Sequence, residues 1–276
     1  MDIYGRTFKS LRKEKGLTLK EVSNGICSFV ALSRWENGQN NMGFDKVIQL
    51  LKRIEIAPSE FVFITQESKS IFPKEVVNAI NKDHLSVLKD YTLKMINQFH
   101  SSQNKEDLFL AATSANYYYT DTDENLLPII DRKRLVDILE DTAFWGQDDL
   151  LLFGNIVFLL SDQMAYRLAS HIFKTFNFET QNSDILTFYA AISAFLSTVI
   201  KLLSDGEIAL AKQLLQTIDQ VKMDSYSLYP QLAKVFLMAL ANKEIQKAMS
   251  IINFLIEIDM TSTADSFLQI YKKVVN

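Results

Sequence analysis

Apolar residues recur every three or four positions along most of this chain, which is the spacing of one face of an α-helix. In the N-terminal quarter this spacing predicts five short helices over residues 3–61, the third of which ends at Asn37 and Gly38. Thr18 and Glu21 have the spacing of a capping box, and Ser28 is placed to cap the third helix. We expect this unit to have a core of Phe8, Leu11, Val22, Ile26, Leu32, Trp35, Val47, Leu50, Leu51 and Ile54.

From residue 73 onward the helical spacing continues, and no strand-like alternation of useful length interrupts it. The 276 residues include only 8 Gly and 4 Pro, which favours long helices over a turn-rich sheet protein. We therefore predict an all-α chain, in which a five-helix N-terminal unit is followed by a larger helical region.

The C-terminal third contains a weak internal repeat. Residues 204–211 and 241–248 each lie between two amphipathic helices, with Glu207 and Glu244 at matching positions 37 residues apart. Residues 161–165 are a looser copy. A period in the middle thirties is typical of tetratricopeptide-like hairpins, which stack into a curved array with a groove suited to an extended peptide. An irregular helical bundle is the alternative.

These patterns predict three parts: a five-helix unit at residues 1–64, a short polar linker at 65–72, and a helical-repeat domain at 73–276. The longest uncharged stretch, residues 185–200, contains Ser and Thr and ends before Lys201, so we expect a buried bundle helix and no membrane span. The single cysteine, Cys27, excludes an intramolecular disulfide framework. With no signal-peptide pattern at the N-terminus, this favours the cytoplasm.

Charge is distributed unevenly between the two regions. Residues 1–64 hold 10 Lys and Arg against 7 Asp and Glu, a net charge of +3, whereas the remaining 19 basic and 26 acidic residues give −7. A mildly basic unit attached to an acidic one is compatible with phosphate binding by the first unit alone.

Residues 16–38, with their two short helices and tight turn, resemble the helix-turn-helix of phage-repressor and Xre-type regulators. In that family an Arg late in the first helix pairs with a Glu near the end of the third, which is the recognition helix. Counting back from Gly16 and Gly38 places Arg12 and Glu36 at these positions. The resemblance therefore implies a structural clamp between these two side chains.

The same resemblance implies which residues face duplex DNA. The recognition helix would enter the major groove, with Arg34 placed to contact a guanine or a phosphate. Phe29 and Val30 depart from the polar residues that many repressors have there; they would contact thymine methyl groups or pack against the turn. The full predicted DNA-binding set is Lys20, Ser28, Phe29, Val30, Ser33, Arg34 and Asn37, with Lys20, Ser28 and Asn37 as phosphate contacts.

Residues 145–155, Trp-Gly-Gln-Asp-Asp-Leu-Leu-Leu-Phe-Gly-Asn, resemble the core of the Rgg/GadR/MutR regulators of Gram-positive bacteria. The order of an Xre-type unit and a helical-repeat region follows the same plan. This resemblance implies a homodimer that binds double-stranded promoter DNA through residues 1–64, with residues 73–276 as the dimerisation and effector-binding domain. Contact with RNA polymerase is left open. Many members of the wider group, which includes PlcR and PrgX, bind a short linear signalling peptide.

If the repeats curve as expected, the first helix of each hairpin lines the peptide groove. An Asn amide both donates and accepts hydrogen bonds and so can hold a peptide backbone, while an Arg can hold a carboxylate terminus. On this basis we expect the groove wall to include Asn155, Gln163, Arg167, Tyr189 and Ser193.

Motifs for catalysis are missing from the sequence. The three histidines, His84, His100 and His171, are far apart in sequence and have no partners at metal-ligand spacing. No Gly-rich phosphate loop or Gly-x-Ser-x-Gly elbow occurs. We therefore expect no enzyme activity, no cofactor and no metal. Three alternatives stay open: a scaffold or inhibitor protein that does not bind DNA, a regulator without a ligand, and a redox role for Cys27.

Overall fold

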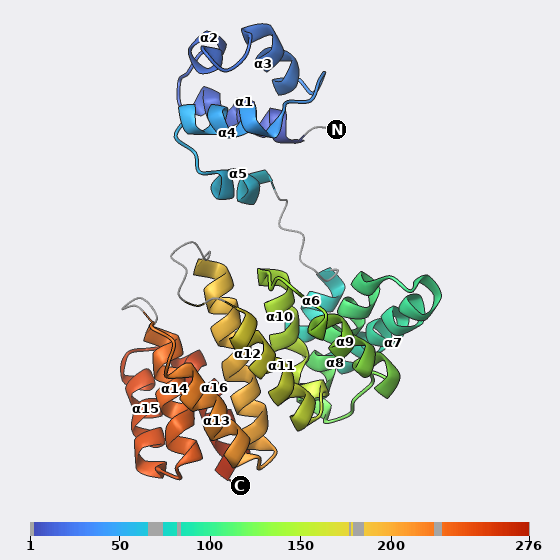
Figure 1. The fold of residues 1–276 in the computed structure, drawn as a ribbon, viewed down its shortest axis with the longest axis vertical. Helices are drawn as coiled ribbons and strands as arrows, with labels where there is room; N and C mark the ends of the chain where they lie inside the picture. Colours follow the sequence, from blue (N-terminus) through green and yellow to red (C-terminus); the bar gives the residue numbers. More distant parts are fainter. Residues whose placement is uncertain are drawn as a thin grey trace. The chain divides into compact units, whose positions relative to one another are not determined.

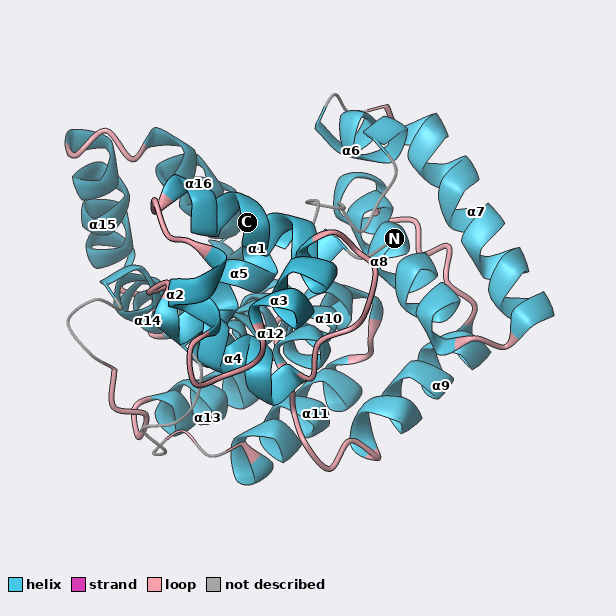
Figure 2. Ribbon diagram, turned by 90° about the horizontal axis from the view of Figure 1, so that it is seen from above, coloured by secondary structure: helices cyan, strands magenta, loops and turns pink. Residues whose placement is uncertain are grey.

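The computed structural model describes residues 3–65, 74–81, 84–176, 178, 185–223 and 228–275, and these form helices joined by turns, without a strand among them (Figures 1 and 2). The chain divides into two compact units, Met1–Pro73 and Lys74–Asn276, which we call the head and the body. The all-α prediction is confirmed for the described residues.

The head contains five helices within its described residues. Thr18 accepts a hydrogen bond from the Glu21 amide while the Glu21 carboxylate accepts one from the Thr18 amide, so the predicted capping box is present. The buried core contains Phe8, Leu32, Trp35, Leu50 and other predicted residues. The helices are α1 (Ile3–Glu14), α2 (Leu19–Ser23), α3 (Phe29–Glu36), α4 (Phe44–Arg53) and α5 (Pro58–Thr65).

The last head helix is longer than the sequence pattern predicted. It continues past Phe61 to Thr65, whose hydroxyl donates to the carbonyl oxygens of Phe61 and Val62 and is buried. Thr65, assigned to the predicted linker, is therefore part of α5. The rest of that linker, residues 66–72, lies outside the described residues, so its boundaries stay predictions.

The body is built from two adjoining rows of helices. One row consists of α8, α10, α12 and α14, and the other of α9, α11 and α13, which follow the outside of an arc in Figure 2. The helices are α6 (Lys74–Asn81), α7 (Leu85–Ser102), α8 (Lys105–Thr122), α9 (Ile129–Glu140), α10 (Gln147–Ile156), the 3₁₀ turn η1 (Val157–Leu159), α11 (Asp162–Thr175), α12 (Ile185–Ser204), α13 (Ile208–Ile218), α14 (Leu228–Ala241), α15 (Ile245–Glu257) and α16 (Thr261–Val275).

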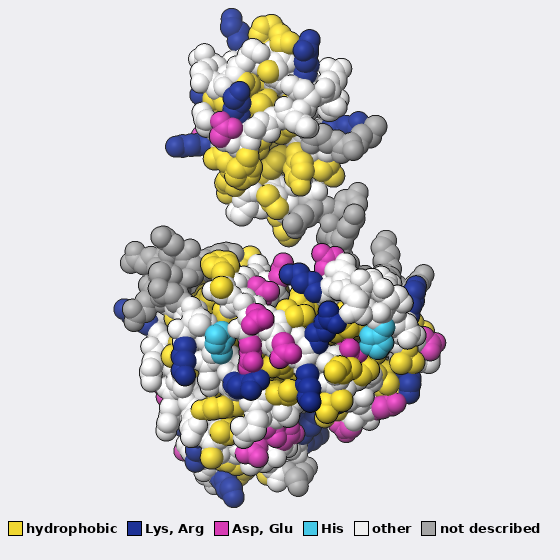
Figure 3. All heavy atoms as spheres, turned by 45° about the vertical axis from the view of Figure 1, so that its right-hand side comes forward, with side chains coloured by type: hydrophobic (Ala, Val, Ile, Leu, Met, Phe, Trp, Pro, Cys, Tyr) yellow, Lys and Arg dark blue, Asp and Glu magenta, His cyan; other side chains and the backbone are white. Residues whose placement is uncertain are grey.

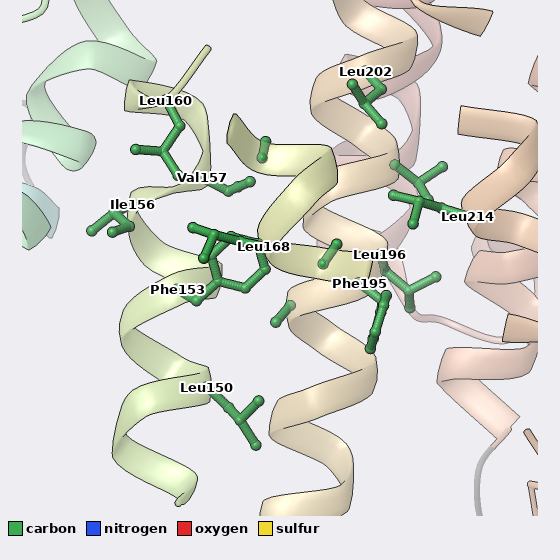
Figure 4. Packing of buried hydrophobic residues seen from close by; sticks show 14 of the residues in the cluster. Leu150, Phe153, Ile156, Val157, Leu160, Leu168, Phe195, Leu196, Leu202 and Leu214 are labelled. Atoms are coloured by element: carbon green, nitrogen blue, oxygen red, sulfur yellow. The ribbon is translucent and has the colours of Figure 1, made fainter. Parts of the chain in front are cut away.

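Helix α12 is the central helix of the body. It packs against α10, α11, α13, α14 and α16, and 56% of its most apolar window is buried, although its length and composition would also suit a membrane span. The sequence-based prediction of a buried bundle helix agrees with this packing. Apolar side chains from α10, η1, α11 and α13 meet α12 in the core (Figure 4).

Small residues let α10 and α12 approach closely. A Cβ atom added to Gly154 would lie 3.4 Å from the Ala194 Cα atom, at the close limit of ordinary van der Waals contact. The α10 backbone therefore packs directly against α12 at this crossing.

The predicted 37-residue repeat is confirmed by matching turns after α12 and α14. The Glu207 amide donates to the Leu202 carbonyl, and the Glu244 amide donates to the Ala239 carbonyl, each at 2.8 Å. The residue before each glutamate is left-handed, with φ of 84° at Gly206 and 60° at Lys243. Both turns therefore have the Schellman pattern that ends a helix.

Candidate functional site

Helix α3 presents apolar and basic side chains to solvent on one side and core side chains on the other. The Ser28 hydroxyl oxygen accepts a 3.1 Å hydrogen bond from the Ala31 amide, so Ser28 is the N-cap as predicted. Phe29 is 59% exposed and Val30 is 43% exposed, whereas Leu32 and Trp35 are buried. The predicted outward and inward faces of α3 are thus confirmed at these positions.

The predicted clamp between Arg12 and Glu36 is present. Arg12 Nε donates to Glu36 Oε1 at 2.6 Å and Nη2 donates to Oε2 at 2.7 Å, while Nη1 donates to the Leu17 carbonyl at 2.6 Å. The two side chains are only 7% and 1% exposed. The hydrogen bonds to Glu36 raise the pKa of the Arg12 guanidinium further. A buried, bidentate contact therefore joins α1 to the end of α3.

Two further residues hold α1 against α3, and the sequence analysis missed both. A Cβ atom on Gly5 would lie 2.1 Å from the Trp35 carbonyl oxygen, so only glycine allows this close approach. Lys9 Nζ donates to Asn37 Oδ1 at 2.6 Å, directly after the end of α3. The sequence did offer a signal for Gly5. Glycine destabilises a helix, so a glycine within the first turns of an amphipathic helix indicates that close packing requires it there.

The second helix of the motif is held by Arg53 on α4. Its guanidinium donates to the Glu21 carbonyl at 3.0 Å and to the Asn24 carbonyl at 3.1 Å, so it satisfies carbonyl groups at the end of α2. This contact spans about thirty residues of sequence, and the helical periodicity of α4 does not indicate it.

The other predicted DNA contacts are exposed or half-buried on the head surface. Lys20, Ser28, Arg34 and Asn37 are exposed and Ser33 is half-buried. The Ser28 hydroxyl and the Asn37 carbonyl oxygen already accept intramolecular hydrogen bonds, so their remaining donors are the groups available to a phosphate.

The Cys27 side chain is half-buried against the head core, and burial raises the pKa of its thiol above the ordinary value.

The body has an uncharged hollow of about 270 Å³ between α12, α14 and α16. Two of the predicted groove residues, Tyr189 and Ser193, lie in its wall. The full lining contains no Lys, Arg, His, Asp or Glu and consists of Tyr189, Ser193, Leu196, Ser197, Ile200, Tyr229, Pro230, Ala233, Phe236, Leu237, Phe267 and Ile270.

The structure separates the other three predicted groove residues from this hollow. Asn155 is half-buried on α10, in the same row of helices as α12, but it does not line the hollow. Gln163 and Arg167 lie on α11, in the row of α9, α11 and α13, and do not line the hollow. Arg167 forms an ion pair with Glu140 of α9, at 2.5 Å.

Among the described residues, no three His, Cys, Asp or Glu side chains are grouped closely enough to hold a metal ion.

The buried ion pair leads to a testable expectation about stability. Arg12→Met or Glu36→Met should each cost about 3–5 kcal/mol, because either leaves one buried charge without its partner. The double variant should cost clearly less than the two single costs together. Denaturant unfolding followed by Trp35 fluorescence in a Trp145→Phe background measures these differences for the head.

Lys9→Met, which removes an exposed hydrogen bond, serves as the control and should cost less than about 1 kcal/mol. A cost for Arg12→Met no larger than this control would contradict the role assigned to the clamp.

Comparison with known protein families and structures gives matches over nearly the whole chain. Residues 8–61 match a helix-turn-helix family, and residues 66–269 match the C-terminal domain of the HTH-type transcriptional regulator Rgg.

Solved structures share the fold over nearly the whole length of this chain. The Streptococcus dysgalactiae SHP pheromone receptor Rgg2 is 15% identical, with 98% of this chain and 99% of that chain covered and a TM-score of 0.78. A Listeria monocytogenes EGD-e protein assigned as a transcriptional regulator is 17% identical, with coverages of 99% and 97% and a TM-score of 0.76. PrgX in complex with iCF10 is 12% identical, with coverages of 99% and 96% and a TM-score of 0.74.

At these identities the solved structures establish a common fold, while the family match spans most of the body and a helix-turn-helix precedes it. This chain therefore belongs to the Rgg family of helix-turn-helix transcriptional regulators.

Proposed function

We propose that this protein is a homodimeric regulator in the cytoplasm that binds a two-fold promoter site through α3 and responds to a short apolar peptide bound in the body. The observation that carries the DNA-binding part is the fixed position of α3: the buried Arg12–Glu36 pair and the Gly5 contact hold its inner side, which leaves Phe29, Val30 and Arg34 outside. An α-helix held in this way fits the width of the major groove.

Arg34 is the side chain best suited to read a base. It lies in the last turn of α3 and is exposed, and its guanidinium can donate two parallel hydrogen bonds to guanine O6 and N7. Phe29 and Val30 offer apolar contact to thymine methyl groups. Lys20, Ser28, Ser33 and Asn37 would contact phosphates or sugars and fix the register of the head.

The preferred operator can be selected from a random duplex library with the full chain. On that operator, Arg34→Ala should cost about 1–3 kcal/mol of binding free energy and relax the preference for one guanine. Lys20→Ala should weaken binding to all sequences about equally, because a phosphate contact carries no sequence information. Titration of the two variants by fluorescence anisotropy gives both quantities.

An unchanged base preference in Arg34→Ala would reassign this residue to the DNA backbone. Failure of the library to yield any enriched sequence would favour the scaffold or inhibitor function over DNA recognition.

The homodimer is supported by an uncharged apolar face on the head. A hollow of about 660 Å³ between α1, α4 and α5 has no charged residue in its lining, and Phe44 at its edge is 76% exposed. Tyr4 and Phe63 are 52% and 78% exposed, and Figure 3 shows hydrophobic side chains gathered on the side of the head that α5 occupies. The three rings alone leave about 400 Å² of apolar area in solvent, roughly half of what one partner buries in a standard interface.

A second copy of the head is the occupant that this face suits best. A two-fold interface brings the same surface of both copies together, so the surface must match itself. An uncharged face with a hollow beside a projecting Phe63 meets this requirement, whereas it offers no charge complementarity to the acidic body. Two heads joined in this way would present half-sites about 10 base pairs apart, or a multiple of this spacing.

Cysteine cross-linking tests this head interface in the full chain. In a Cys27→Ser background, Phe63→Cys should form a disulfide-linked dimer on mild oxidation, because residues near a two-fold axis approach their own copies. Glu14→Cys, at the opposite end of α1 from Tyr4, is the control and should stay monomeric on denaturing gels. Equal cross-linking of both variants, or none at position 63, would show that the apolar face is covered by something other than a second head.

The peptide-binding part is supported by the hollow between α12, α14 and α16. It has no charged residue to pair with a charged ligand group, so a buried charge there would be strongly unfavourable. Ser193, Ser197 and the two tyrosines supply hydrogen-bonding groups along an otherwise apolar wall. The hollow thus suits an apolar peptide side chain, with Asn155 on the neighbouring helix as a candidate contact to the peptide backbone. PrgX, whose fold this chain shares, has been solved in complex with cCF10 and with iCF10.

A ligand that binds only the folded chain stabilises that chain and raises its melting temperature. At a ligand concentration one hundred times the dissociation constant, the free energy of unfolding rises by about 2.7 kcal/mol. We expect at least one synthetic apolar peptide of about eight residues to do so. Ser193→Trp should fill the hollow and abolish the shift, whereas Ser262→Trp, an exposed position on α16 outside the lining, should retain it. If no peptide in a broad apolar set moves the melting temperature of the wild-type chain, the protein is a regulator without a peptide ligand.

Peptide binding regulates transcription only if it favours one arrangement of the heads over another, since a ligand with equal affinity for both states shifts nothing. The same switch can act through contact with RNA polymerase at the promoter.

A further inference from the structure

One side of α1 carries three cations that lie outside the Arg12–Glu36 clamp. Arg6, Lys9 and Lys13 have the i, i+3, i+7 spacing of neighbours along one side of a helix, and we call them the basic stripe. Arg6 and Lys13 are exposed and Lys9 is half-buried. Glu14 is the acid that α1 contains, and it accepts a 2.9 Å hydrogen bond from the Ser10 hydroxyl.

The basic stripe lies next to the end of the recognition helix. Lys9 Nζ donates to Asn37 Oδ1 at 2.6 Å, and Asn37 is the C-cap of α3. Gly5 and Arg12 hold α1 against Trp35 and Glu36, so this placement is fixed by backbone contact and a buried ion pair. A duplex that receives α3 in its groove would therefore bring a phosphate backbone near the stripe.

Cations three or four positions apart on a helix repel one another, although Lys13, in the last turn of α1, is favoured by the helix dipole. A bound anion would offset the repulsion along the stripe. The stripe therefore suits a negatively charged partner.

We propose that the basic stripe of Arg6, Lys9 and Lys13 is a second DNA-contacting surface, which binds backbone phosphates next to the groove that α3 enters. This inference rests on the proposed DNA binding of the head. The stripe adds affinity for any duplex and carries no base preference, because phosphates are the same at every sequence. Lys9 also holds the carbonyl oxygen of the Asn37 amide, which leaves the amide N–H groups of Asn37 as donors to the same backbone.

The test is the salt dependence of non-specific binding by the full chain. The probe is a duplex of about 30 base pairs of random sequence, titrated by fluorescence anisotropy at several salt concentrations. Each phosphate contact contributes about 0.9 to the slope of log affinity against log salt concentration. R6Q/K9Q/K13Q should therefore reduce the magnitude of the slope by about 2.7, and each single variant by about 0.9.

The control is K243Q/K272Q/K273Q, which removes three exposed lysines from the body and changes the net charge of the chain equally. It should leave the slope within error of the wild-type value, and thermal melting should show that both triple variants are folded. On the selected operator, R6Q/K9Q/K13Q should keep the base preference that Arg34→Ala relaxes.

A wild-type slope in R6Q/K9Q/K13Q, or an equal reduction in the control, would overturn the stripe proposal and leave DNA recognition by α3 intact. A wild-type chain that binds neither the random duplex nor any selected operator would overturn the stripe and the proposed DNA binding together.

Discussion

The buried ion pair between Arg12 and Glu36 is the interaction on which the DNA-binding surface depends. Removing two charges from water is costly, and the cost is offset only when geometry is good and every donor has an acceptor. Here two parallel hydrogen bonds join the guanidinium to the carboxylate, and the remaining Arg12 nitrogen is satisfied by the Leu17 carbonyl. The same guanidinium thus ties α3 to α1 and to the loop before α2. An apolar pair of similar volume can stabilise a buried site equally well, but it would lack the two directional hydrogen bonds that join Arg12 to Glu36.

The body meets a different constraint, which is to bury very apolar helices such as α12 in one core. It does so by close packing around α12, with Gly154 and Ala194 where backbones cross and larger apolar side chains between them. Lys201 is a charged residue that is buried in this core and paired with two carboxylates. It is 6% exposed, yet its ammonium donates to Asp162 at 2.8 Å and to Asp205 at 2.5 Å, and these hydrogen bonds raise its pKa despite burial. The charge is kept because both partners lie at helix ends open to solvent.

Much of the fold and part of the site could be predicted from the sequence. Helical periodicity gave the elements, local capping rules gave Thr18, Glu21 and Ser28, and family spacing gave Arg12 and Glu36, because each of these signals lies within a few residues or a fixed pattern. Gly5, Lys9 and Arg53 were missed because their partners are separated from them in sequence by most of the head and bond through backbone carbonyls or a cap. Gln163 and Arg167 were predicted for the groove wall from the expected curvature of the repeats, which does not indicate which helices border the hollow.

The contact between Gly154 and Ala194 has a mechanical consequence. Ala194 follows Ser193 directly, and the two residues contact different parts of the body. Ser193 borders the uncharged hollow, whereas the Ala194 backbone packs against α10. Gly154 and Ala194 have no side-chain rotamers that could adjust to a displacement. A ligand beside Ser193 that shifted α12 would therefore press the Ala194 backbone directly on α10.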